Sequence, residues 1–94
     1  MSVVRREIII RNALGLHARP AMQFVDLANQ FNSDITVEKD GDEPVTVDGK
    51  SVMQMITLEA VQGTTLKVQA AGDDADDAIE QLAKLVDEKF GEDE

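Results

Sequence analysis

The chain contains a single histidine, His17, in the stretch Gly15-Leu16-His17-Ala18-Arg19-Pro20. A neutral imidazole is a good nucleophile near neutral pH and can form a covalent bond to phosphorus. Arg19, two residues further on, offers a fixed cation that suits a phosphate group. Residues of these types at this spacing indicate phosphoryl transfer, with His17 as the group that carries the phosphate.

A helix that starts just after His17 would complete such a site. Pro20 suits the first turn of a helix, because its missing N–H would have no partner there, and Gly15 permits a sharp turn before it. The N–H groups of a first turn point outward with the positive end of the helix dipole, so they bind anions. A lone histidine before a helix is also a common cap or surface residue, and on chemistry alone this plainer interpretation stays open.

Hydrophobic periodicity gives the elements that must position these residues. Alternation predicts strands and helical spacing predicts helices. In chain order we expect a strand at 3–11, a helix at 18–31, a hairpin at 34–48 whose second strand contains Val45 and Val47, a short helix at 51–57, a strand at 64–71 and a last helix whose buried stripe reaches Phe90. Every strand has one apolar and one polar face, which favours an antiparallel sheet covered on one side. We therefore expect an α+β fold of order β-α-β-β-α-β-α. This is an open-faced sandwich in which a four-stranded antiparallel sheet carries three helices on one face.

We expect one domain over residues 1–91, followed by a frayed acidic tail at 92–94. Asp73 or Asp74 is expected to cap the last helix, whose Asp-rich first turn complements the helix dipole. Phe90 is expected to end the buried stripe of that helix, and Gly91 to close it.

Composition excludes several classes of function. The net charge is -10, and residues 73–94 hold ten acidic and two basic side chains, so nucleic acid, which demands a basic face, is not an expected partner. Cysteine is absent, which rules out thiol catalysis and cysteine metal sites, and no metal or nucleotide motif is visible. The N-terminus is too charged for a signal peptide, and no apolar run is long enough to span a membrane. We expect a cytoplasmic protein that exchanges phosphate with other molecules.

The segment G-L-H-A-R-P-A at residues 15–21 resembles the active-site signature of HPr, the phosphocarrier family of the bacterial phosphoenolpyruvate-dependent phosphotransferase system. Asn12-x-Leu14 before it is also typical of many members, and Lys50-Ser51-Val52-Met53 is similar to the family's second landmark. The resemblance covers nearly the whole chain, in length and in element order.

The resemblance implies a role for each residue of the site. His17 would accept phosphate on Nδ1 from enzyme I, itself charged by phosphoenolpyruvate, and donate it to an enzyme II-type protein. Arg19 would steady the phosphate, and the backbone amides of Ala18 and Arg19 would complete the site. No cofactor is implied. We expect a monomeric carrier with a phosphohistidine intermediate rather than a classical turnover enzyme.

Ser51 has two candidate roles. The pattern Ser51-Val52-Met53-Gln54 fits a capping box, in which Ser51 caps a short helix and Gln54 reaches back to it. In many family members the matching serine is phosphorylated by a regulatory kinase, which slows transfer at the histidine. Because a phosphate is electrostatically tolerated at a helix N-terminus, the two roles are compatible.

The short helix at 51–57 is unusually apolar. By matched position in the family, Val52, Met53 and Ile56 are expected to be exposed and to dock partner proteins, and the alternative is a helix that is wholly buried. Helix 18–31 departs from the family, since it carries Asp26 and Asn29 where relatives often place lysines. This departure leaves the identity of the partners open.

Two other functions compete with the carrier. One is a regulatory binding module that acts through Ser51 phosphorylation and the 51–57 helix. Family variants of that type lack the histidine, whereas this chain retains it. The other is an unrelated small α+β binding module that shares only the fold, which the intact segment 15–21 disfavours.

Overall fold

The computed structural model describes residues 2–92 and contains one four-stranded antiparallel sheet. Its strands are β1 (Ser2–Ile9), β2 (Asp34–Lys39), β3 (Val45–Asp48) and β4 (Thr65–Gly72). They lie in the order β1-β4-β2-β3, so that β4 pairs with the first strand on one side and with β2 on the other. The hairpin of β2 and β3 forms the far edge. The expected α+β sandwich is confirmed.

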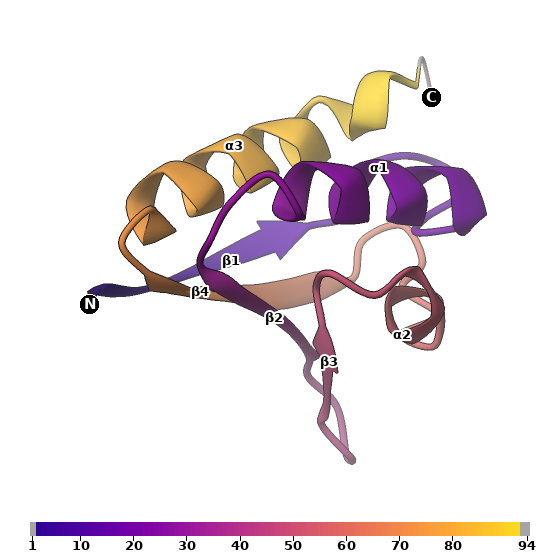
Figure 1. The fold of residues 1–94 in the computed structure, drawn as a ribbon. Helices are drawn as coiled ribbons and strands as arrows, with labels where there is room; N and C mark the ends of the chain where they lie inside the picture. The colour runs from indigo at the N-terminus through magenta and orange to yellow at the C-terminus, as the bar shows by residue number, and fades with distance from the viewer. Residues whose placement is uncertain (1, 93–94) are drawn as a thin grey trace.

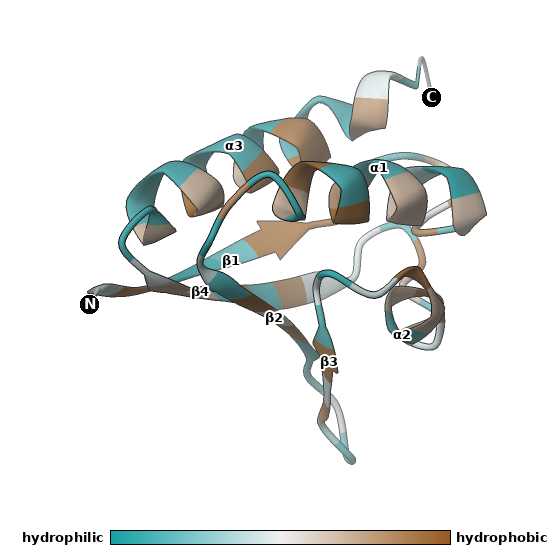
Figure 2. Cartoon of the chain, in the orientation of Figure 1, coloured by the Kyte–Doolittle hydropathy of each residue, from teal (hydrophilic) through white to brown (hydrophobic). Residues whose placement is uncertain are grey.

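The helices are α1 (Ala18–Ala28), α2 (Val52–Ile56) and α3 (Ala75–Asp87), and a 3-10 turn, η1 (Lys89–Gly91), follows the last of them. Figure 1 shows α1 and α3 next to each other over one face of the sheet, with the short α2 near α1. Each long helix turns its apolar stripe toward the sheet and its polar side outward (Figure 2). This one-sided pattern is the cause of the layered arrangement, because only one face of each element needs a partner.

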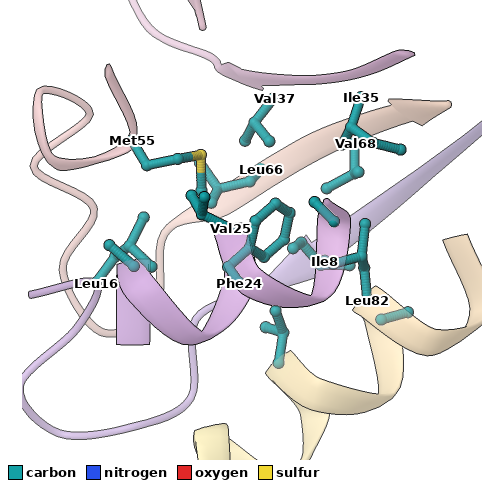
Figure 3. Close-up of a cluster of buried hydrophobic side chains, with 14 of the residues drawn as sticks. Ile8, Leu16, Phe24, Val25, Ile35, Val37, Met55, Leu66, Val68 and Leu82 are labelled. Carbon is teal, nitrogen blue, oxygen red and sulfur yellow. The ribbon is translucent and has the colours of Figure 1, made fainter. Parts of the chain in front are cut away.

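The core lies between the helices and the sheet. Phe24 of α1, which is 1% exposed, lies among aliphatic side chains from several elements (Figure 3). The labelled neighbours come from the sheet, from α2 and from α3: Ile8, Ile35, Val37, Met55, Leu66, Val68 and Leu82. The alternation seen in the sequence of β4 is confirmed, since its inward positions are all buried.

Both long helices end earlier than the sequence periodicity predicts. Asn29 is the C-cap of α1: its backbone N–H makes the last helical hydrogen bond, to the Val25 carbonyl at 2.9 Å, and its side-chain Nδ2 donates to the same oxygen at 3.0 Å. The next two backbone N–H groups donate only three residues back, to the carbonyls of Leu27 and Ala28, so the helix does not continue. Asparagine competes in this way with helix continuation. Helix α3 ends at Asp87, and Lys89 and Phe90 beyond it have left-handed φ angles of 57° and 55°. Phe90 is buried as expected, but from the turn and not from the helix.

Asp74 occupies the N-cap position of α3, yet its carboxylate does not cap the helix. It accepts hydrogen bonds from the backbone N–H groups of Asn32 at 2.8 Å and Ser33 at 2.9 Å, and from the Ser33 hydroxyl. The expected local cap is therefore wrong, because a loop distant in sequence offers the carboxylate three donors. Asp74 joins the connection between α1 and β2 to the start of α3.

Asp74 makes the stability of the fold depend on pH. The hydroxyl of Ser33, and next the backbone N–H of Asn32, hold the pKa of the Asp74 carboxyl below its ordinary value. A lowered folded-state pKa stabilises the fold above the ordinary pKa of about 3.9, and this contribution is lost as the pH falls through the folded value. At neutral pH we expect wild type to have a higher urea midpoint of unfolding than Asp74→Asn. The difference between the two midpoints should shrink below about pH 4.

The matched control is Asp73→Asn, which removes the same charge from an exposed neighbour. Its urea midpoint should lie close to that of wild type over the whole range. A difference between wild type and Asp74→Asn that stays constant from neutral to acidic pH would contradict the assignment.

Candidate functional site

The loop before α1 is held against the segment that follows α2. Gly15 has a φ of 71°, and a Cβ on it would lie 2.5 Å from the carbonyl oxygen of Ala60 and 2.9 Å from Cα of Val61. The next residue, Leu16, is buried and donates its backbone N–H to the Ala60 carbonyl at 2.8 Å. The expected tight turn and close backbone approach at Gly15 are confirmed, and they fix the point at which the helix begins.

His17 is the N-cap residue of α1, with an extended backbone at φ -82° and ψ -173°. Its carbonyl accepts the first helical hydrogen bond, from Ala21 N–H at 3.0 Å. The imidazole makes no capping hydrogen bond, and 37% of the side chain is exposed. The interpretation of His17 as a side-chain cap is therefore wrong, and its ring is accessible to solvent at the positive end of the helix.

Ala18 and Arg19 are the first two residues of α1. Their backbone N–H groups have no acceptor within a helix that begins there, and Pro20, the third residue, has no N–H. The Arg19 side chain is exposed, and among residues 2–92 no carboxylate lies within ion-pair distance of it. Two amide donors and a guanidinium thus lie next to His17 in sequence, where an oxyanion can use them.

Two buried or half-buried side chains from outside the motif complete the surroundings of His17. Glu92, at the other end of the chain, places Oε2 at 3.1 Å from His17 Nε2. Its other oxygen, Oε1, accepts from Asn12 Nδ2 at 3.1 Å, and the same Nδ2 donates to the Gly15 carbonyl at 2.7 Å. Asn12 is fully buried, and its Oδ1 has no partner among the described residues.

This role of Glu92 was not apparent in the sequence, where the residue is expected to begin a frayed tail. Glu92 is separated from His17 by 75 positions, and no periodic pattern connects them. Residues 93 and 94 of the expected tail lie outside the described residues.

Ser51 caps α2 as expected, since its Oγ accepts the backbone N–H of Gln54 at 3.3 Å. The second half of the capping box is wrong. Gln54 Oε1 accepts instead from the backbone N–H of Asp48 at 2.9 Å, because the Ser51 N–H already donates to the Asp48 carbonyl at 3.1 Å.

Helix α2 is neither wholly buried nor exposed at all three expected positions. Met53 is 79% exposed and Ile56 39% exposed, whereas Met55 is fully buried in the core. Val52 is half-buried and packs against the core, so its expected exposure is only partly met. The alternative of a wholly buried helix is wrong.

Asp26 and Asn29, the two departures from the family pattern in α1, are both exposed. Asn29 has a structural role as the cap of α1 and also donates to the Lys50 carbonyl at 3.5 Å. Asp26 adds a negative charge to the outer face of the helix.

Two surface hollows formed by the described residues lie away from His17. One groove follows β1 and the adjoining side of α3, and another lies on the open face of the sheet. Among residues 2–92 no set of three potential ligands could hold a metal ion, and no helix there has the length and apolar character needed to cross a bilayer. The arrangement at His17 is an exposed surface site, where a group can pass directly between proteins.

Comparison with known proteins supports the geometry. A family model described as "PTS HPr component phosphorylation site" matches residues 4–88. The phosphocarrier protein HPr of Borreliella burgdorferi is 41% identical over 85 residues, which cover 90% of this chain and 95% of that protein. The crystal structure of HPr-C-His from Thermoanaerobacter tengcongensis matches with a TM-score of 0.89 and 44% identity, over 97% of this chain and 99% of that one. Crh of Bacillus subtilis, whose crystal structure is described as a swapped dimer, matches with a TM-score of 0.71 and 41% identity, over 92% and 95% of the two chains.

Proposed function

Because the chain belongs to the HPr family of phosphotransferase-system phosphocarriers, we propose that His17 accepts a phosphoryl group from enzyme I and donates it to an enzyme II-type protein. The observation that carries this proposal is the position of the His17 ring. It is accessible at the N-terminus of α1, next in sequence to two backbone amides without helical acceptors and to the Arg19 guanidinium, which has no carboxylate partner among residues 2–92. These groups suit an anion that must be held briefly and released.

The transfer is a displacement at phosphorus. The lone pair of His17 Nδ1 forms the new N–P bond as the bond between phosphorus and the donor breaks, and the electron pair of that bond returns to the donor. The amides of Ala18 and Arg19, together with the Arg19 guanidinium, receive the phosphoryl oxygens. Donation to the next protein is the same step in reverse, with an acceptor side chain as nucleophile.

The direct test is incubation of the protein with phosphoenolpyruvate and enzyme I from the same organism. We expect stoichiometric labelling that is labile in acid and stable in alkali, as a phosphoramidate is, and that maps to the peptide containing His17. No label on the protein, under conditions in which enzyme I itself is charged, would reject the proposal.

The same chemistry distinguishes the regulatory alternative, in which Ser51 is the modified residue. A phosphate ester on serine is stable in acid, and it would form with ATP and a kinase from a cell extract. The Ser51 hydroxyl accepts a single long hydrogen bond at 3.3 Å, so it is open to modification. The retained histidine favours the carrier as the principal function, with Ser51 as an additional regulatory site.

We propose that partner proteins dock on apolar side chains around His17. The described residues include eight large apolar side chains that are exposed, and five of them lie on the loop before α1, on α1, on α2 or just after it: Leu14, Met22, Met53, Ile56 and Val61. The other three lie on strands. Methionine is adaptable and suits a surface that meets several partners in turn.

Replacement of Met53 by aspartate should weaken docking without touching the phosphate site. We expect an increase of about tenfold in the KM for this protein as substrate of enzyme I, as for a contact near the centre of an interface. The measurement is the initial rate of labelling as a function of protein concentration. Val45→Asp, which makes the same change at an exposed position of β3, is the control and should leave KM within about twofold. Equal effects of the two variants would argue against docking through α2.

We further propose that the chain acts in the cytoplasm as a monomer. His17 and Met53 are both accessible in the single chain, so transfer needs no second copy. Crh, in contrast, is described as a swapped dimer. The labelling experiment should therefore include a measurement of the mass of the labelled species in solution.

A further inference from the structure

The chain end beyond α3 follows an unusual path that leads back to the phosphate site. Three consecutive residues, Lys89, Phe90 and Gly91, have φ angles of 57°, 55° and 78°. Residues other than glycine rarely adopt this left-handed backbone conformation. Such residues are concentrated at functional sites, so a functional reason should be sought here. The buried ring of Phe90, 3% exposed, and the hydrogen bond from Glu92 N–H to the Lys89 carbonyl at 2.9 Å hold the turn.

This turn delivers the Glu92 carboxylate to His17. The start of α1 and the turn η1 lie at the same end of the molecule (Figure 1). Both carboxylate oxygens are engaged, Oε2 with His17 Nε2 and Oε1 with Asn12 Nδ2, each at 3.1 Å. Only 22% of the Glu92 side chain is exposed.

Asn12 holds Glu92 and leaves one of its own polar atoms unsatisfied. Its Nδ2 is fixed by the Gly15 carbonyl at 2.7 Å as well as by Glu92, and its buried Oδ1 has no partner among the described residues. A buried polar atom without a partner is unfavourable and rare. The two acceptors next to Nδ2, the Gly15 carbonyl oxygen and Glu92 Oε1, also establish the orientation of the Asn12 amide. A reversed amide would place Oδ1, which can only accept, against both of these oxygens.

We propose that Glu92 is a positioning residue for His17. An ionised carboxylate can only accept hydrogen bonds, so the ring must donate through Nε2–H. In the neutral ring this leaves the lone pair on Nδ1, which is the nucleophile of the proposed function. The role of Glu92 in phosphoryl transfer therefore rests on the proposed function. Its effect on the tautomer of His17 does not depend on that function.

Glu92 also suits the state in which His17 carries phosphate. When Nδ1 bonds to phosphorus, Nε2 keeps its proton and the ring gains a positive charge, which the carboxylate neutralises. When the phosphoryl group leaves, the electron pair of the N–P bond returns to Nδ1 and the ring is neutral again. Because the carboxylate contacts Nε2, it does not occupy the nitrogen at which phosphorus bonds. A buried aspartate acts on a catalytic histidine in a comparable way in serine proteases.

The test uses the fact that the chain has one histidine, so a 15N spectrum contains a single pair of ring nitrogens. At a pH where the ring is neutral, wild type should show the Nε2–H tautomer. In Glu92→Ala the ratio of the Nδ1–H form to the Nε2–H form should rise about three- to tenfold, the effect of one charge-assisted hydrogen bond that is partly exposed. Glu88→Ala, which removes the same charge from an exposed residue nearby, should leave the ratio unchanged.

A second variant weakens the contact without removing the side chain. The substitution Glu92→Gln removes the negative charge and leaves one acceptor oxygen for two donors, His17 Nε2–H and Asn12 Nδ2, so we expect a tautomer ratio between those of wild type and Glu92→Ala. Its rate of labelling at His17 should fall several-fold, and that of Glu92→Ala about tenfold. An unchanged tautomer ratio in Glu92→Ala would overturn the inference. A shifted ratio in a protein that enzyme I cannot label would overturn the proposed function and leave the positioning of the ring in place.

Discussion

The His17→Ala protein should take up no phosphate from charged enzyme I. Without the imidazole, no side chain at the N-terminus of α1 can form an N–P bond, because a guanidinium such as that of Arg19 has no nucleophilic lone pair and the remaining donors are backbone amides. The backbone amides and the guanidinium that bind the anion would remain, but no covalent bond to phosphorus could form there. We expect the acid-labile label to fall to background in a gel or mass-spectrometric assay that detects stoichiometric labelling of wild type.

The loss should not come from unfolding. His17 makes no capping hydrogen bond and its side chain is 37% exposed, so the free energy of unfolding should change by no more than about 1 kcal/mol. Circular dichroism and a urea transition of the variant provide this control. Acid-labile phosphate on the folded variant would identify a different phosphoryl acceptor and contradict the assignment of His17.

The acidic α3 does not compete with phosphate at His17. Figure 1 shows that α3 starts at the end of the molecule opposite to the start of α1, so its Asp-rich first turn lies far from the site. Exposed charges separated by more than a Debye length of about 8 Å are largely screened at physiological salt. The negative charge of this first turn therefore affects which proteins approach the molecule more than it affects the chemistry at the ring.

Features set by neighbouring residues could be predicted from the sequence. The alternation in β4 and the apolar stripe of α3 report directly which side of each element faces the core, because burial repeats with the geometry of strand and helix. The position of His17 at the start of a helix could be predicted because its signals are also local. Gly15, Pro20 and the change from alternation to helical spacing all lie within a few residues of it.

Features that depend on contacts between distant segments could not be predicted. Asp74 has the pattern of a helix cap, yet its carboxylate binds the loop at residues 32–33, and no local pattern reveals which donors win. Glu92 has the pattern of a solvated tail, yet left-handed conformations at Lys89 and Phe90 direct it to His17. Those conformations are not the preference of either residue type, so they follow from tertiary packing rather than from local sequence.

Replacement of Gly15 by alanine should destabilise the fold and impair transfer together. The new Cβ would lie 2.5 Å from the Ala60 carbonyl oxygen and 2.9 Å from Cα of Val61, so backbone must move on one side of the loop. The left-handed φ of 71° adds a cost of about 1–2 kcal/mol, and the steric overlap adds about 1–3 kcal/mol. We expect a loss of about 3 kcal/mol in the free energy of unfolding, a large part of the stability of a small domain.

Gly63→Ala provides the matched control, because Gly63 also has a positive φ, 90°, but a Cβ there would meet no atom within 4 Å. It should lose only the conformational part, about 1–2 kcal/mol, and its rate of labelling at His17 should match that of wild type.

In Gly15→Ala the loop that leads into α1 must shift, and a misplacement of about 1 Å at a reacting group can cost a factor of about 100 in rate. The measurements are urea unfolding and the initial rate of labelling at a temperature where both variants are folded. Equal losses of stability in the two variants would show that the backbone conformation alone matters at Gly15, and a normal labelling rate in Gly15→Ala would show that the close approach to Ala60 does not position His17.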